Sequence, residues 1–200
     1  AELGINLPRP TPLFVFPNIA SYVGADIVAG MISTRLEQST GNVLMIDVGT
    51  NGEIALAIDG EISTTAAPAG PAFEGAEIIH GMRATNGAIE RVRLDNEGVH
   101  LEVIGDAKPT GICGSGLVEA VAEMIRTGLV AVTGRLLHPE EARDAGPPAL
   151  ARRVFPDDIG GYFLLYGDSP EAEDRVILHA ADIRQLQLAK GSIRCGVNAL

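Results

Sequence analysis

The feature that most constrains the fold of this chain is a pair of closely spaced turn motifs, Asn51-Gly52 and Asp59-Gly60, set among apolar residues. Asn-Gly and Asp-Gly are strong signals for two-residue hairpin turns, because both residues of such a turn adopt positive φ. The flanking segments Val43–Val48, Glu53–Ile58 and Glu61–Ala67 have strand-like sequences. The pattern predicts an antiparallel meander of three strands, the first of which is an apolar run typical of a buried strand.

The rest of the chain predicts a mixture of helices and strands. We expect a strand over Pro12–Ala20, helices over 21–34, 117–128 and 181–200, a short helix near 73–79, a hairpin over 89–105, and strands over 161–167 and 175–179. Leu117, Val121 and Ile125 are expected to share one helix face, and residues 134–160 show no clear core pattern. The chain is therefore expected to be a single α+β domain over residues 1–200, a mixed sheet with hairpins and flanking helices.

Composition narrows the function classes. Hydrophobic residues make up 46% of the chain and aromatic residues only 4%, so the core is expected to be aliphatic. A formal net charge of −11 argues against a nucleic-acid-binding surface. No apolar run approaches the length of a membrane span, so we expect a cytoplasmic protein without membrane contact. The chain begins without Met and stops inside a predicted helix, as a piece of a longer protein would.

The segment Asp47–Gly52 joins a carboxylate at a strand end to a turn that contains glycine. Gly49 and Gly52 have no side chain to keep a ligand away from the backbone. Backbone N–H groups in such a turn form an anion-binding concavity, to which Thr50 and Asn51 add side-chain donors. The carboxylate of Asp47 can hold Mg²⁺ through water or orient an attacking water. The segment predicts a phosphate-binding hairpin; the alternative is a plain hairpin in which Asp47 bonds to its own turn.

A second glycine-rich stretch, Gly111–Gly116, leads directly into a predicted helix. Because a helix N-terminus attracts phosphate, Gly114, Ser115 and Gly116 are candidate phosphate contacts. Close packing of the helix on a sheet, with Ser115 as the N-cap, explains the same residues equally well. Asp26 lies in a helix of mostly small and apolar residues, where it is either a surface carboxylate or a functional one. The cysteines and histidines show no ligand spacing, and we expect packing or surface roles for them.

Five long segments carry a family resemblance: PNIASYVGADIVAG, MIDVGTNGEIAL, AAPAGPAFEGAEIIHGMRATNGAIERV, GICGSGLVEAVAEMI and IRQLQLAKGSIRCG. Together they resemble the C-terminal region of the reductive activators of corrinoid proteins, ATP-dependent iron–sulfur proteins that return cob(II)amide to the cob(I)amide state. The resemblance covers nearly the whole chain and is weakest over Arg135–Pro156. That family is similar to acetate and sugar kinases, heat-shock ATPases and actin. The resemblance implies that this chain folds as a ribonuclease-H-like lobe of an actin-like ATPase region.

The resemblance also implies cofactors and partners. ATP and Mg²⁺ are expected in the full-length protein, with Asp47 as a catalytic residue and metal ligand and Asp47–Glu53 as the second phosphate hairpin of the superfamily. An earlier phosphate loop and a later adenosine-contacting Gly-Gly segment are expected outside this chain. A [2Fe–2S] cluster is expected in a missing N-terminal part, because two cysteines cannot supply four thiolates. The expected partner is a corrinoid protein or a corrinoid-dependent methyltransferase, and dimerisation is left open.

Two other hypotheses remain. The sequence Gly24-Ala25-Asp26 before an Asp-x-Gly-Thr hairpin is similar to type III pantothenate kinases, in which Asp26 would be a catalytic base for a small metabolite. Ile27 stands where those kinases have an arginine, which leaves a substrate-anchoring cation missing. Asp26 is expected near the nucleotide cleft in either case. The other hypothesis is a nucleotide-free module that docks a corrinoid protein.

Overall fold

The computed structural model describes residues 9, 12 and 14–200. The chain divides into two compact units, one comprising residues 1–47, 53–66 and 200, the other comprising residues 48–52 and 67–199. The sequence predicts a single domain over residues 1–200, and this stays a prediction. The buried side chains of the described residues form two separate clusters, one in each unit.

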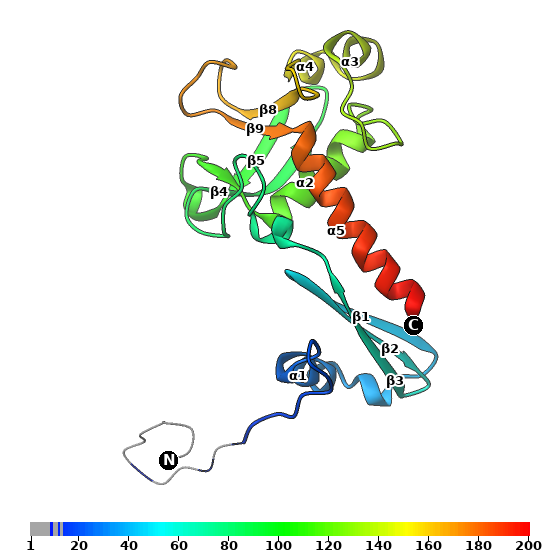
Figure 1. Cartoon of the computed structure of the whole chain (residues 1–200). Coiled ribbons are helices and arrows are strands. Elements are labelled where there is room, and N and C mark those ends of the chain that lie inside the picture. The colour runs from blue at the N-terminus through cyan, green and yellow to red at the C-terminus, as the bar shows by residue number, and fades with distance from the viewer. Residues whose placement is uncertain (1–8, 10–11, 13) are drawn as a thin grey trace. The chain divides into compact units, whose positions relative to one another are not determined.

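The first unit is a helix packed on a three-stranded sheet with the strand order β1-β2-β3 (Figure 1). Its elements are α1 (Ala25–Thr34), η1 (Leu36–Gln38), β1 (Asn42–Val48), β2 (Asn51–Ile58) and β3 (Glu61–Pro68). Ile27 and Met31, one helical turn apart, are buried with Ala55 and Ala57, which alternate along β2. The β1–β2 turn and the end of β3 belong to the second unit.

The second predicted turn is confirmed, and the first is displaced. Asp59 and Gly60 connect β2 to β3 with φ values of 49° and 87°, as the Asp-Gly signal predicts. Asn51 and Gly52, in contrast, are the first residues of β2, and the turn consists of Gly49 and Thr50. The Gly49 N–H donates to the Asn51 carbonyl at 3.0 Å, which closes the turn earlier than the Asn-Gly signal predicts.

Two further expectations for this part of the chain are wrong. Most apolar residues of β1 are not in a core: Val43, Leu44, Ile46 and Val48 are between 37% and 49% exposed, because β1 is an edge strand of its sheet, and Met45 alone of its described apolar residues packs against the buried cluster. Of the strand expected over Pro12–Ala20, position 13 lies outside the described residues, and the others show only an isolated bridge from Ala20 to Val23.

The second unit contains two further three-stranded sheets, with the orders β5-β4-β6 and β7-β8-β9. Its strands are β4 (Ala88–Leu94), β5 (Val99–Val103), β6 (Gly111–Ile112), β7 (Val154–Phe155), β8 (Tyr162–Tyr166) and β9 (Val176–His179). Its helices are η2 (Pro71–Glu74), η3 (Ile104–Asp106), α2 (Gly114–Arg126), α3 (Pro139–Ala145), α4 (Pro148–Ala151) and α5 (Ala180–Ala199). Strand β4 pairs antiparallel with β5 and parallel with β6, and β8 pairs antiparallel with both of its neighbours.

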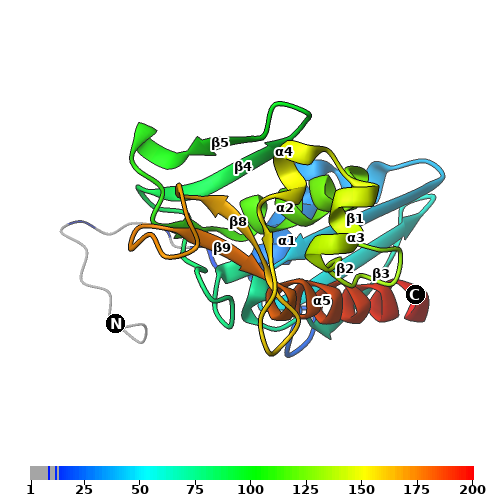
Figure 2. The same ribbon diagram turned by 90° about the horizontal axis from the view of Figure 1, so that it is seen from above.

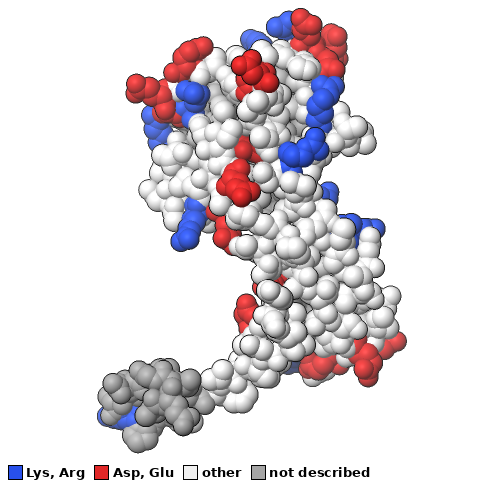
Figure 3. Space-filling model, in the orientation of Figure 1, with Lys and Arg blue, Asp and Glu red and all other residues white. Residues whose placement is uncertain are grey.

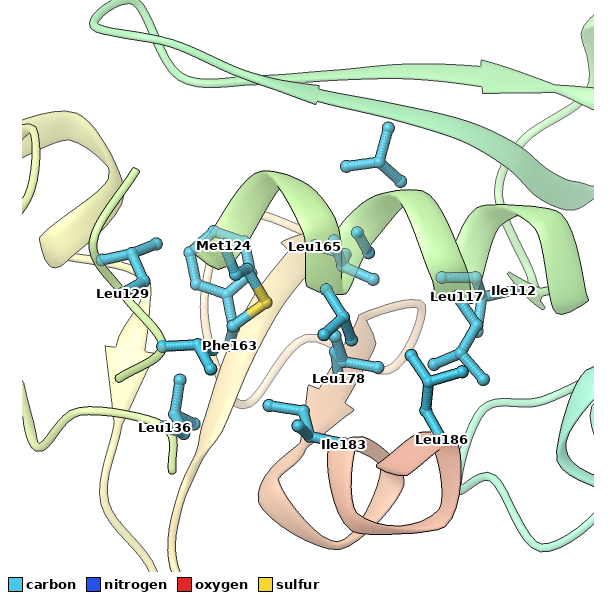
Figure 4. Packing of buried hydrophobic residues seen from close by; sticks show 14 of the residues in the cluster. Ile112, Leu117, Met124, Leu129, Leu136, Phe163, Leu165, Leu178, Ile183 and Leu186 are labelled. Carbon is cyan, nitrogen blue, oxygen red and sulfur yellow. The ribbon is translucent and has the colours of Figure 1, made fainter. Parts of the chain in front are cut away.

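Helix α2 lies at the centre of this unit, with β4 and β5 on one side and β8 and β9 on the other (Figure 2). Leu117 and Met124 of α2 are buried against side chains of β8 and β9 and of α5 (Figure 4). Gly128, with a φ of 78°, follows the end of the helix as a left-handed terminator. The predicted β4–β5 hairpin, the strands β8 and β9 and the terminal helix are all confirmed.

Part of this core could not be predicted from the periodicity of the sequence. Residues 134–160, which lack a periodic pattern, form α3, α4 and β7 and bury Leu136, Leu150 and Val154. These elements are too short for periodicity to be detected. Ile125, expected on the buried face of α2, is 53% exposed, and Met124 takes its place. The expected helix near 73–79 is the shorter η2.

Every helix in the described part of the chain is too short or too polar to span a bilayer. On the face shown in Figure 3, acidic and basic side chains are intermingled over the second unit, so this face carries no continuous basic stripe.

Candidate functional site

The β1–β2 turn presents few free polar groups, and each can be identified. The Gly49 N–H is already bonded to the Asn51 carbonyl, and the Thr50 carbonyl accepts the Gly70 N–H at 2.9 Å. The Thr50 N–H and the Asn51 side-chain amide make no hydrogen bond to another described residue. These two groups are the donors that the turn can offer to a ligand.

The Thr50 hydroxyl is not one of those free donors. It donates to the Glu74 carboxylate, which lies at the end of η2. Thr50 and Glu74 are both exposed, and Glu74 forms no salt bridge with a described cation. The structure therefore places a carboxylate beside the turn that the sequence interpretation did not include. Its position between Gly70 and Gly75 in a Gly- and Pro-rich segment was the available signal.

The absence of a side chain at Gly49 and at Gly52 has a different structural explanation in each case. A Cβ at Gly52 would lie 2.8 Å from the Ile193 side chain of α5, so Gly52 serves helix packing. A Cβ at Gly49 would meet only the Asn51 carbonyl, at 3.5 Å, which is an ordinary contact. Gly49 therefore leaves open space over the turn, as the phosphate hypothesis requires, whereas Gly52 is explained without a ligand.

Asp47 lies at the end of β1 in the first unit and is exposed. Its carboxylate makes no hydrogen bond or ion pair with any other residue that the structure describes. The plain-hairpin alternative, in which Asp47 bonds to its own turn, is therefore not observed. A free carboxylate directly before the turn remains available to a metal ion or a water molecule.

The N-terminus of α2 combines packing with free N–H groups. Cys113, not Ser115, is the N-cap. A Cβ at Gly114 would lie 2.0 Å from the Phe73 carbonyl oxygen, and one at Gly116 would lie 2.3 Å from that of Ile89. Both glycines are thus required by close backbone packing. The first-turn N–H groups of the helix nevertheless remain without intrahelical partners, and Ser115 is exposed beside them.

An open groove of about 1550 Å³ lies in the second unit, and Gly49, Thr50, Asn51 and Gly52 of the turn are not among its lining residues. Val48 and Glu74 line it next to the turn, and Cys113, Gly114 and Ser115 line it at the start of α2. Its walls are mostly apolar, and its basic side chains come from three positions that sequence interpretation missed: Arg83, Lys190 and Arg194. Gly116 is buried and does not line the groove.

Asp26 has a local explanation. It lies in the first turn of α1 in the first unit, is exposed, and accepts the Ile27 N–H at 2.9 Å. A carboxylate in this place is stabilised by the positive end of the helix dipole. The observed contact is the one expected for a helix-surface residue.

A second cluster of titratable residues lies outside the groove. Asp182 is fully buried and accepts the N–H groups of Ile79, at 3.0 Å, and His179, at 2.8 Å. Burial raises the pKa of Asp182. The His179 ring bonds to Asp157 at 2.7 Å through Nε2 and accepts the Ala181 N–H at 2.9 Å through Nδ1. Because every group here already has a partner, the cluster holds the start of α5 in place and has no reactive group to spare.

Comparison with known proteins places these features in a family. Residues 41–200 match the model of a family described as the C-terminal domain of RACo, the ASKHA domain, and residues 1–39 match one described as the RACo middle region. ASKHA denotes the superfamily of acetate and sugar kinases, heat-shock ATPases and actin. The corrinoid activation enzyme RamQ of Eubacterium limosum is 39% identical over 192 residues, 94% of this chain and 31% of that protein.

Two further proteins are similar. The [Co(II) methylated amine-specific corrinoid protein] reductase of Methanosarcina barkeri is 33% identical over 140 residues, 59% of this chain and 26% of that protein. A solved structure of a reductive activator for corrinoid, iron–sulfur protein matches with a TM-score of 0.76 and 38% identity, over 92% of this chain and 28% of the other. This chain thus spans less than a third of the length of the curated relatives.

The two family matches divide the chain near residue 40. The middle-region match ends at residue 39 and the ASKHA match begins at residue 41, so the β1–β2 hairpin lies in the ASKHA segment. The assignment of Asp47–Glu53 to the second phosphate hairpin of the superfamily stays a prediction. Asp26 falls in the middle-region match, outside the ASKHA segment.

Proposed function

We propose that this chain is part of an ATP-dependent activator, because it belongs to the RACo family of reductive activators of corrinoid proteins. The full-length protein would restore a corrinoid protein, or a corrinoid-dependent methyltransferase, to the cob(I) state by electron transfer. The observation that carries the nucleotide part of this proposal is the groove of the second unit, which Val48 and Glu74 line next to the β1–β2 turn and which Gly114 and Ser115 line at the N-terminus of α2.

The residues present suit the phosphates of a nucleotide. The Thr50 N–H, the Asn51 amide and the first-turn N–H groups of α2 are donors of the kind that bind phosphate oxygens. Arg83, Lys190 and Arg194 line the groove that begins at Val48 and Glu74, next to the turn, and supply positive charge. Asp47 offers a free carboxylate of the kind that binds Mg²⁺ through water. Bound ATP would supply the free energy for an uphill electron transfer, and these residues would bind and orient its phosphates.

The residues of this chain do not suit an iron–sulfur cluster. Such a cluster takes four thiolates, whereas the two cysteines of the chain are Cys113, which is buried, and Cys195, which is exposed. We therefore assign the electron-carrying [2Fe–2S] centre to another part of the full-length protein, and the present residues to the nucleotide. A homodimer and a cytoplasmic location remain compatible with this assignment.

A nucleotide titration of the full-length protein, with and without a corrinoid protein, tests the proposal. We expect ATP to bind in the presence of Mg²⁺ and its affinity to change about 5- to 150-fold when the corrinoid protein is added, since coupling between two sites is typically 1–3 kcal/mol. Corrinoid binding that is indifferent to nucleotide would support the docking-module alternative instead. A phosphorylated small-molecule product would support the metabolite kinase.

A further inference from the structure

The contact between Thr50 and Glu74 determines how the Thr50 side chain can act on a ligand. The hydroxyl hydrogen points to a Glu74 carboxylate oxygen. A hydroxyl has one hydrogen and two acceptor lone pairs, so this hydrogen bond leaves Thr50 with only lone pairs to offer. The sequence predicts that the Thr50 hydroxyl donates a hydrogen bond to phosphate. In the observed arrangement its hydrogen is already donated to Glu74, so the oxygen can only act as an electron-pair donor. A ligand that matches it is a cation.

The backbone on both sides of Glu74 is held by close packing. The Phe73 carbonyl lies against Gly114 at the start of α2, and Gly75, with a φ of 80°, leaves no space for a Cβ beside the Met82 backbone. The turn is fixed to the same segment by the Gly70 N–H, which donates to the Thr50 carbonyl. The backbone of Glu74 and that of Thr50 are thus held near each other by neighbouring backbone contacts.

The charge at this pair is uncompensated. No described lysine, arginine or histidine forms a salt bridge with Glu74, and its second carboxylate oxygen makes no hydrogen bond to another described residue. Carboxylate and hydroxyl oxygens are ligands of the kind that Mg²⁺ prefers. In P-loop NTPases a Ser or Thr hydroxyl likewise binds the ion of the bound nucleotide, although that fold is unrelated to this one.

We propose that Glu74 orients the Thr50 hydroxyl as a direct ligand of a nucleotide-bound Mg²⁺ ion and that the second Glu74 oxygen holds one of the ion's waters. Glu74 is a positioning residue in this arrangement, and Thr50 makes the contact with the ion. The inference rests on the proposed function, since the nucleotide brings the ion to the groove.

The decisive experiment measures ADP binding to the full-length protein by calorimetry, once with saturating Mg²⁺ and once with EDTA. We expect Glu74→Gln and Thr50→Val each to reduce the affinity for ADP with Mg²⁺ about tenfold, the effect of losing roughly 1.4 kcal/mol. Affinity in EDTA should change by no more than about twofold. Thr50→Ser, which keeps the hydroxyl, should retain the effect of Mg²⁺. The double variant Thr50→Val/Glu74→Gln should lose little more than either single variant, because the two side chains act as one unit.

Glu77→Gln is the matched control, because Glu77 is an exposed carboxylate of the same segment without a contact to the turn. Equal losses with Mg²⁺ and with EDTA would show that Glu74 only holds the hairpin, and would overturn the inference. Unchanged binding in both variants would also overturn it. If the wild-type protein binds no nucleotide under either condition, the proposed function itself fails, which is a distinct result.

Discussion

Two glutamates of α2 serve as hydrogen-bond partners for the open edge of strand β4. Strand β6 pairs only with Ala88 and Ile89 of that edge. Further along it, the N–H of Val92 donates to Glu119 at 3.0 Å and the N–H of Leu94 to Glu123 at 2.7 Å. The side chains thereby satisfy buried backbone groups that would otherwise be costly to leave without partners.

Glu123 gives the first prediction at this scale. The Arg126 guanidinium beside it, and the Leu94 N–H, lower the pKa of Glu123 to about 2. Because this pKa lies below the ordinary value of 4.5, the stabilisation is present above pH 4.5 and is lost as the pH falls toward 2. Glu123→Ala should weaken the protection of β4 amides by about 1–3 kcal/mol at neutral pH. Hydrogen-exchange mass spectrometry would measure this, and the difference from wild type should shrink below pH 4.

A second prediction at the residue scale concerns Asp47. Asp47→Asn keeps the shape of the side chain but removes the charge proposed to hold Mg²⁺ or orient water. We expect ATP-stimulated corrinoid reduction by the full-length protein to fall about 10²–10³-fold, as for the loss of a single electrostatic stabiliser. The fold should be unaffected, because the carboxylate has no partner among the described residues. The exposed Glu61 provides the control Glu61→Gln. A fully active Asp47→Asn variant would remove this residue from the mechanism.

At the scale of elements, helices α2 and α5 each contain a glycine that can be tested. Close packing requires Gly116 of α2, whereas no neighbouring atom requires Gly191 of α5. A Cβ at Gly116 of α2 would lie 2.3 Å from the Ile89 carbonyl oxygen, whereas one at Gly191 of α5 would have nothing within 4 Å. Gly116→Ala should destabilise α2 and β4 by about 1–3 kcal/mol through overpacking. Gly191→Ala should stabilise α5 by roughly 0.5–1 kcal/mol. Hydrogen exchange across the two helices would show opposite changes; equal effects would contradict the packing account.

The same elements show what could be predicted from the sequence and what could not. Long periodic segments, such as α5, and the Asp59-Gly60 turn have local signals that agree with the final structure. The Asn51-Gly52 signal was overridden, because the turn closes at Gly49 and Gly52 packs against Ile193 of α5. That contact joins residues far apart in the sequence, which local patterns cannot reveal. The pairing of Thr50 with Glu74 is hidden for the same reason.

At the scale of the whole molecule, the chain covers less than a third of each curated relative that it matches, and its two cysteines cannot hold a cluster. The 200-residue chain alone should therefore be colourless and free of iron when purified. Stoichiometric iron with a visible absorption band that bleaches on reduction would show that the cluster has been assigned to the wrong part of the protein.

The central claim is that this chain belongs to a protein that uses ATP to drive electrons into a corrinoid. The most direct test mixes the full-length protein, a low-potential reductant and a corrinoid protein in the cob(II) state, and follows cob(I) formation by absorbance. In the proposed reaction, each corrinoid would take up one electron from the reduced iron–sulfur centre. We expect cob(I) to accumulate when ATP and Mg²⁺ are both present, and little to form when either is left out. Equal cob(I) formation without ATP, or none under any condition, would contradict the account.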